Sequence, residues 1–101
     1  MIDVRFLRVA EAEVDEAIAY FDGQRAGLGE RFEAALLDAV QFIARRPLAG
    51  PVIGGRVRKF GLRTFRYNVI YVADADEVVI VAVAHHRRRP AYWRDRLQQL
   101  T

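Results

Sequence analysis

The side chains best suited to chemistry gather in the last third of the chain. Two adjacent histidines, His85 and His86, precede three consecutive arginines, and Tyr92 follows them. Cleavage of RNA by its own 2′-hydroxyl needs a base for that hydroxyl, an acid for the leaving oxygen and positive charge on the phosphorane. Histidine is the best candidate base, because its ordinary pKa lies near neutrality. The residues that could in principle fill these roles are His85 or His86, Tyr92, Lys59 and Arg66.

Several of these residues also have a purely structural interpretation. One of the two histidines can point inward as a hydrogen-bonded core residue while the other is solvated. Arg66 can be a solvated or ion-paired strand residue on the face of Asn68. Tyr92 and Trp93 could stack on a base or dock on a protein, but for Trp93 we favour an anchor between the C-terminal segment and the core. The arginines at 87–89 favour binding to phosphate or to acidic groups.

The charge is distributed unevenly along the chain. Residues 1–55 carry six arginines against nine acidic residues, a net charge of −3, whereas residues 56–101 carry nine arginines and one lysine against four acidic residues, a net charge of +6. A cationic half on a small domain attracts nucleic acid or an acidic protein, and charge alone does not distinguish the two. The sequence therefore predicts a binding surface in its C-terminal half.

Composition excludes other classes of site. With no cysteine and only two adjacent histidines, the chain can build neither a thiolate metal site nor a two-imidazole zinc site of helical spacing. It has no glycine-rich phosphate loop, nucleophile triad or carboxylate pair, so we expect no metal and no cofactor. The chain lacks a long apolar run, and its first six residues alternate like a strand rather than a secretory signal. We expect a cytoplasmic protein with no membrane contact.

Hydrophobic periodicity indicates the elements that must position these side chains. Residues 2–8 alternate as a strand, and residues 10–24 and then about 30–46 repeat at helical spacing on either side of a glycine-containing break, which predicts a helical hairpin. Arg45 and Arg46 followed by Pro47 form a helix stop. Residues 47–55 are expected to be a loop.

The period then changes to that of strands. Residues 56–60, 63–73 and 77–85 predict a three-stranded antiparallel meander, in which the apolar run 78–84 is central and covered on both sides. Residues 90–100 could form a short last helix, with Trp93 and Leu97 at i,i+4 spacing. The expected fold is a single α+β domain over residues 1–101, ordered β-α-α-β-β-β(-α), with a helical hairpin packed on a mainly antiparallel sheet.

Element order and three local sequences together resemble the RelE/ParE toxin superfamily over nearly the whole chain. The sequences are ARRPLAG at 44–50, TFRYNVIYV at 64–72 and AVAHHRRRPAYWRDRL at 82–97, the last of which is similar to the tail of ParE-type plasmid-stabilisation toxins. The resemblance implies a cytoplasmic toxin that is neutralised by an antitoxin encoded beside it. That antitoxin typically wraps helices and a strand around the toxin, in a hetero-oligomer expected to be a heterotetramer or larger.

The superfamily contains two activities: RelE-type members cleave mRNA on the ribosome, and ParE-type members inhibit DNA gyrase. Matching the RelE-type catalytic positions places Lys59, Arg66 and Tyr92 on like residues, but Val57 stands where lysine is usual and His86 where arginine is usual. The resemblance thus favours a ParE-type gyrase inhibitor that is not an enzyme.

Two alternatives remain open. One is an mRNA endonuclease that uses His86, Arg66, Lys59 and Tyr92, and the other is an adaptor that only binds its antitoxin. The residues expected to bind the target or the antitoxin are Arg58, Arg66, His85, Arg87, Arg88, Arg89, Tyr92 and Trp93.

Overall fold

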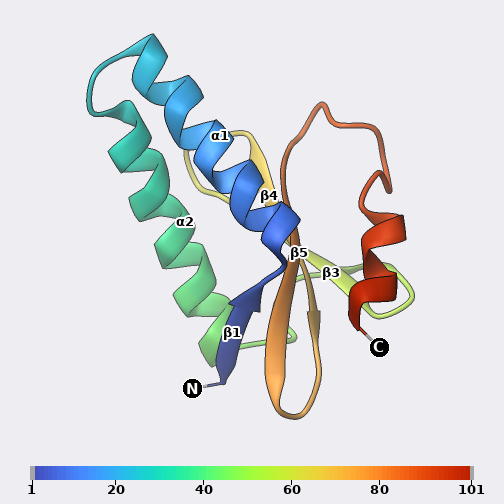
Figure 1. The fold of residues 1–101 in the computed structure, drawn as a ribbon. Coiled ribbons are helices and arrows are strands. Elements are labelled where there is room, and N and C mark those ends of the chain that lie inside the picture. Colours follow the sequence, from blue (N-terminus) through green and yellow to red (C-terminus); the bar gives the residue numbers. More distant parts are fainter. Residues whose placement is uncertain (1, 101) are drawn as a thin grey trace.

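The computed structural model describes residues 2–100, which form a two-helix hairpin packed on a five-stranded mixed sheet (Figure 1). The predicted α+β class is confirmed. The elements are β1 (Asp3–Phe6), α1 (Arg8–Gln24), α2 (Leu28–Arg45), β2 (Val52–Gly54), β3 (Val57–Gly61), β4 (Tyr67–Ala73), β5 (Glu77–His85) and a 3-10 helix, η1 (Arg94–Leu100). No helix within residues 2–100 is long and apolar enough to cross a membrane.

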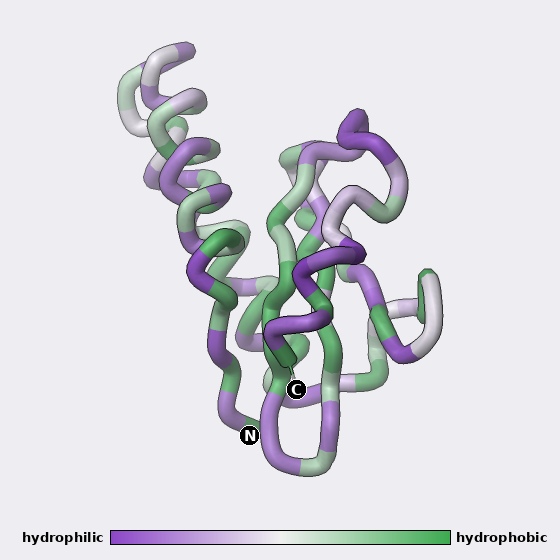
Figure 2. Tube along the Cα trace, turned by 45° about the vertical axis from the view of Figure 1, so that its right-hand side comes forward, coloured by the Kyte–Doolittle hydropathy of each residue, from purple (hydrophilic) through white to green (hydrophobic). Residues whose placement is uncertain are grey.

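The sheet has the strand order β1-β5-β4-β3-β2, with β1 parallel to β5 and all other neighbours antiparallel. The prediction of a central strand is confirmed, because β5 lies between β1 and β4 and every residue from Val78 to Ala84 is buried. Figure 2 shows the hydrophobic colour along most of β4 and β5. These two strands therefore form the middle of the core.

A β-bulge interrupts β5 where β1 ends. Ile70 of β4 lies opposite Ala82, but Tyr71 lies opposite Ile80, so Val81 is an extra residue on β5. The last residue pair between β1 and β5 is Phe6 with Ile80. A bulge shifts the alternation of the peptide groups by one residue. Beyond the bulge, the carbonyl of Val81 and the N–H of Val83 face away from β4, toward an edge that β1 no longer covers, and they need other partners.

Aromatic rings join the hairpin to the sheet. Phe21 of α1 stacks on Phe32 of α2 with ring centroids 5.2 Å apart, and both rings contact Phe65 and Tyr67 edge-on. The helices cross closely at Gly29, where an added Cβ would lie 2.5 Å from the carbonyl oxygen of Ile18. The hairpin thus covers the sheet face that carries Tyr67.

Three of the predicted boundaries are wrong by a few residues. The first strand ends at Phe6. The N–H of the next residue, Leu7, still donates to the carbonyl of Ile80, but the carbonyl of Leu7 accepts the N–H groups of Ala10 and Glu11, so helix α1 starts at Arg8. β4 starts at Tyr67 rather than at residue 63, because residues 63–66 turn within a loop that the hydrogen bond from Leu62 N–H to the Tyr67 carbonyl closes. The last helix starts at Arg94, after a turn through residues 86–93.

The loop predicted over residues 47–55 is wrong in its second half, where Val52–Gly54 form the edge strand β2. Val52 pairs with Arg58, and the N–H of Lys59 donates to the carbonyl of Pro51. A strand of three residues is too short for alternation to distinguish it from a loop. The antiparallel part of the sheet therefore has four strands instead of three.

Tyr71 fixes the first half of the same segment. Its hydroxyl donates to the carbonyl of Pro47 at 2.8 Å and accepts the buried N–H of Gly50 at 3.0 Å. Arg58 also donates to this segment, to the carbonyls of Leu48 at 3.1 Å and Gly50 at 2.8 Å. The turn after α2 is thus held by two side chains of the sheet.

Tyr71→Phe is expected to lower the free energy of unfolding by about 2 kcal/mol, because a buried N–H and a carbonyl lose their partner. Urea denaturation of the two proteins measures the difference. Tyr20→Phe is the matched control, since the Tyr20 side chain is exposed, and it should change stability by less than about 0.5 kcal/mol. Equal stability of Tyr71→Phe and the unaltered chain would contradict this role.

Candidate functional site

A hollow of about 440 Å³ lies on the sheet face opposite the hairpin, between β2–β5 and the segment that follows β5. We call it the basic cavity. Its lining residues are Ile53, Lys59, Asn68, Ile70, Ala84, His85, His86, Arg88, Arg89, Pro90, Ala91, Tyr92, Trp93 and Arg94. Lys59 and Asn68 face it because their strand neighbours Phe60 and Tyr67 point to the helices, where Phe60 stacks on Phe42 and Tyr67 contacts Phe32 edge-on.

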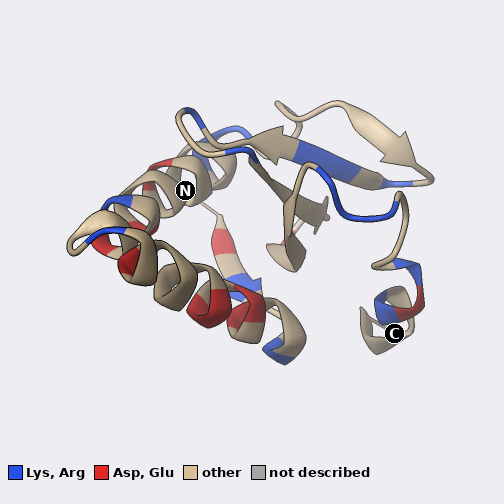
Figure 3. Cartoon of the chain, turned by 90° about the horizontal axis from the view of Figure 1, so that it is seen from above, with Lys and Arg blue, Asp and Glu red and all other residues tan. Residues whose placement is uncertain are grey.

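The cations of the basic cavity lack acidic partners. Within residues 2–100 two ion pairs occur, Arg5 with Glu77 and Arg96 with Glu13, and neither involves a cation that lines the cavity. None of the lining residues is acidic. Figure 3 shows the Lys and Arg colour on the sheet and the segment after it, while Asp and Glu gather on the hairpin. The uneven charge of the sequence thus becomes a separation in space.

The structure brings some of the predicted site residues together and leaves others apart. His86 is exposed and lines the basic cavity with Lys59 and Tyr92, whereas Arg66 lines a different hollow beside Phe65 and Tyr67. His85 lines both hollows, and the N–H of His86 donates to the carbonyl of Arg66 at 2.8 Å. The four residues of the endonuclease alternative are therefore not gathered in one cavity.

The other predicted binding residues differ in exposure. His85 is half-buried, lies edge-on to Tyr67 with centroids 5.3 Å apart, and accepts the N–H of Arg87 at Nδ1. Trp93 is 6% exposed and packs in the core, so it anchors the C-terminal segment and offers little surface to a partner. The predicted binding residues that are exposed, and so open to a partner, are Arg66, Arg87, Arg88 and Arg89.

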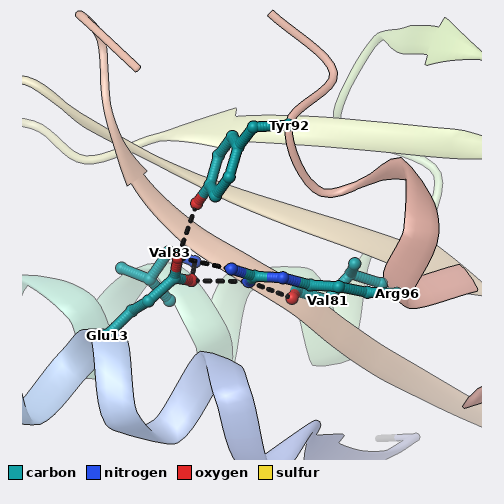
Figure 4. A network of polar contacts seen from close by, with 5 residues as sticks. All are labelled: Glu13, Val81, Val83, Tyr92 and Arg96. Carbon is teal, nitrogen blue, oxygen red and sulfur yellow. Dashed lines mark hydrogen bonds and ion pairs between the residues drawn. The ribbon is translucent and has the colours of Figure 1, made fainter. Parts of the chain in front are cut away.

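Tyr92 belongs to a network of charged groups that joins α1 to η1 (Figure 4). Its hydroxyl donates to Oε2 of Glu13 at 2.7 Å. Arg96 forms a bidentate pair with the same carboxylate, with Nη1 at 2.8 Å from Oε1 and Nη2 at 2.9 Å from Oε2. Sequence reasoning assigned no role to Glu13 or Arg96.

The same pair closes the strand edge beyond the bulge. Oε1 of Glu13 accepts the N–H of Val83 at 3.0 Å, and Nη1 of Arg96 donates to the carbonyl of Val81 at 3.0 Å (Figure 4). One carboxylate and one guanidinium thus provide the acceptor and the donor that a neighbouring strand would provide. The network fixes the C-terminal segment on the sheet and so shapes one wall of the basic cavity.

The network also sets the protonation of its members. Burial by itself would raise the pKa of Glu13, but hydrogen bonds from Arg96, Tyr92 and the Val83 N–H outweigh it and hold that pKa below its ordinary value. Burial and the hydrogen bond to the Glu13 carboxylate raise the pKa of Tyr92 well above its ordinary value. Tyr92 therefore keeps its proton, directs it to Glu13 and is a poor acid for a leaving oxygen. Its ring supports Arg88, whose guanidinium carbon lies 3.9 Å from the ring centroid.

The fold and the site together define the class of protein: a small α+β protein with a helical hairpin, a mixed sheet and a cationic cavity on the open sheet face. Residues 4–90 match the family described as the ParE toxin of the type II toxin-antitoxin system parDE, and the chain belongs to that family. The match ends at Pro90, so the segment with Tyr92, Trp93 and Arg96 lies beyond it.

A solved structure has the same fold. The chain resembles a protein described as the chromosomal ParDE toxin-antitoxin system from P. aeruginosa, with a TM-score of 0.74 and 15% sequence identity, over 84% of this chain and 96% of that chain. No curated protein sequence matches the chain.

Proposed function

We propose that the protein is a ParE-type toxin that inhibits DNA gyrase by binding it and is neutralised in the cytoplasm by a cognate antitoxin. The observation that carries the proposal is the match of residues 4–90 to the ParE toxin family. On this proposal the toxin is a binding inhibitor and not an enzyme.

Two features of the site support binding over RNA cleavage. Arg66 lines a hollow other than the one that Lys59, His86 and Tyr92 line, so the four residues of the endonuclease alternative are not gathered around one reacting phosphate. The hydroxyl of Tyr92 already donates to Glu13 at 2.7 Å, and its raised pKa disfavours proton release.

The antitoxin is proposed to contact the exposed arginines at 87–89. These side chains follow the central strand and form no ion pair within residues 2–100. They give the toxin a positive surface, which an antitoxin with acidic residues would neutralise. An acidic, flexible segment of the antitoxin meets this requirement. The complex is then a hetero-oligomer whose stability depends on salt.

Induction of this chain alone in a bacterium tests the choice of target. We expect a DNA-damage response with intact transcripts, because a poisoned gyrase leaves broken DNA but does not cut mRNA. Purified protein should likewise change gyrase supercoiling or the level of cleavage complexes in vitro. Codon-positioned cuts in mRNA with undisturbed gyrase would favour the endonuclease alternative, and undiminished growth would favour an adaptor.

A further inference from the structure

We propose that two copies of the chain associate head to tail, with residues 46–56 of one copy against the groove between α1 and α2 of the other. We call residues 46–56 the edge segment and the groove the hairpin groove. This inference goes beyond the proposed function, because it concerns a contact between two toxin molecules in which neither gyrase nor the antitoxin takes part.

The exposed apolar side chains fall into two groups. Within residues 2–100, the large hydrophobic residues that are exposed are Val9, Tyr20, Leu37, Leu48, Val52 and Ile53. The first three lie on the helical hairpin, and the last three lie in the edge segment. Leu37 at 55% and Leu48 at 68% are among the most exposed of them. Apolar side chains gathered on a surface mark places of contact with another molecule.

The hairpin groove has a volume of about 540 Å³ and lies between the two helices. Its apolar lining consists of Phe6, Val14, Ala34, Leu36, Leu37 and Val40. Leu36 is buried and Leu37 is exposed, so the groove reaches from the surface to the core. It can therefore receive apolar side chains of another molecule.

Acidic side chains border both sides of the groove. They are Glu11 and Asp15 from α1 and Glu30 and Glu33 from α2, and all four are exposed. None of them forms an ion pair within residues 2–100. Figure 3 shows the acidic colour gathered on the hairpin. The groove thus fits a partner that joins apolar side chains to positive charge.

The edge segment has this composition. Its three exposed hydrophobic side chains lie between Arg46 and Arg56, and Arg45 directly precedes the segment. The three arginines are exposed and form no ion pair within residues 2–100. The segment itself contains no acidic residue. It therefore carries the charge that the rim of the groove lacks.

The edge segment is also held in one conformation. The hydroxyl of Tyr71 and the guanidinium of Arg58 fix its first half, and β2 pairs with β3 in its second half. A segment that is ordered before it binds loses little conformational entropy on binding. It can therefore present Leu48 to a groove without rearrangement.

The two surfaces complement each other, and the chain itself supplies the occupant of the groove. The groove combines an apolar lining with four carboxylates, the segment combines three apolar side chains with flanking guanidinium groups, and no residue belongs to both. Such a contact is heterologous, so association need not stop at the dimer. Because a short segment covers little area, we expect the association to be weak and to depend on salt.

Sedimentation equilibrium of the purified chain, from about 10 µM to about 1 mM protein, tests the association. We expect the average molecular mass to rise with concentration. In about 1 M salt the mass should fall back toward that of the monomer, because salt screens the charges at the rim of the groove.

An exchange of charges tests the contact itself. Glu30→Arg/Glu33→Arg makes the rim of the groove more basic, and Arg45→Glu/Arg46→Glu makes the end of the edge segment acidic. Each double variant alone should self-associate at least about tenfold more weakly, because like charges then meet. An equimolar mixture of the two variants should associate at least about tenfold more tightly than either variant alone, since each groove again meets a segment of opposite charge. Recovery in the mixture shows that both variants are folded.

Two controls separate this contact from a general effect of charge or polarity. Glu16→Arg/Asp38→Arg changes exposed acids of the same two helices that do not line the groove, and it should alter self-association by less than about twofold. Leu48→Ser should weaken self-association at least about fivefold through the loss of apolar contact. Tyr20→Ser removes an exposed ring outside the groove and should change it by less than about twofold.

Three results would overturn the proposal: a chain that stays monomeric at about 1 mM, a mixture of the two double variants that does not associate, or equal effects of the charge exchange and its control. A monomeric chain whose affinity for the antitoxin falls in Glu30→Arg/Glu33→Arg would make the antitoxin the occupant of the groove instead. The sedimentation measurements contain no gyrase, so their failure leaves the proposed target untouched, and a failed gyrase assay leaves them untouched.

Discussion

Replacement of Arg87, Arg88 and Arg89 by glutamate is expected to weaken the complex with the antitoxin at least about a hundredfold, a change of about 3 kcal/mol in binding free energy. The three side chains are exposed and follow directly after the central strand. Their reversal replaces attraction to an acidic segment by repulsion, which slows association and speeds dissociation. Calorimetric titration of toxin with antitoxin at two salt concentrations measures both the loss and its electrostatic origin.

The control carries the same change of charge elsewhere. Arg8, Arg25 and Arg56 are exposed and lie far from the arginine cluster in the sequence, and their joint replacement by glutamate should weaken binding no more than about fivefold. If the two triple variants bind equally well, the arginines at 87–89 do not contact the antitoxin, and its interface lies on another face.

Glu13→Ala is expected to lower the free energy of unfolding by about 3 kcal/mol. The side chains of Glu13 and Arg96 are only 13% and 16% exposed, and removal of the carboxylate leaves a mostly buried guanidinium without its counter-charge. The N–H of Val83 and the hydroxyl of Tyr92 lose their acceptor at the same time. Urea denaturation measures the loss, and hydrogen exchange at Val83 reports whether the strand edge opens.

Glu16→Ala provides the comparison on the same helix, since Glu16 is exposed and lies one turn away from the network, and it should change stability by less than about 0.5 kcal/mol. A loss of similar size in both variants would show that helix α1, and not the network, responds to the change.

Acid should remove the contribution of Glu13. Its pKa is lowered in the folded protein, so the stabilisation is present above its ordinary pKa of about 4.5 and is lost as the pH falls through the lowered value. The difference in stability between the unaltered chain and Glu13→Gln should therefore be constant near neutral pH and shrink below about pH 4. A difference that persists at low pH would mean that the ionised carboxylate is not what stabilises the network.

The helices and the central strand could be predicted from the sequence because each has a regular pattern long enough to read. The hairpin shows a helical period over about ten turns in total, and the run from Val78 to Ala84 has no polar residue. β2 could not be predicted, since three residues carry no period and its pairing depends on Arg58, which lies after the next turn.

The network of Glu13 was missed because Glu13 and Arg96 are 83 residues apart in sequence and come together only through the fold. Tyr92 and Arg96 have the four-residue spacing of one α-helical turn, but the structure forms a 3-10 helix that begins only at Arg94, so this spacing does not explain their contact. Lys59, His86 and Tyr92 line one hollow, whereas Arg66 was placed on a strand that does not begin until Tyr67.

The closure of β5 by Glu13 and Arg96 has a consequence for solubility. A sheet edge with unpaired N–H and carbonyl groups is a template for strands of other molecules, and charged side chains directed into such an edge are a protection against aggregation. Beyond the bulge at Val81, two opposite charges occupy the hydrogen-bonding groups that a foreign strand would need. This protection depends on residues 91–100 staying in place. If that segment detached, the strand edge would be exposed, and we expect the toxin molecules to associate with one another as their concentration rises.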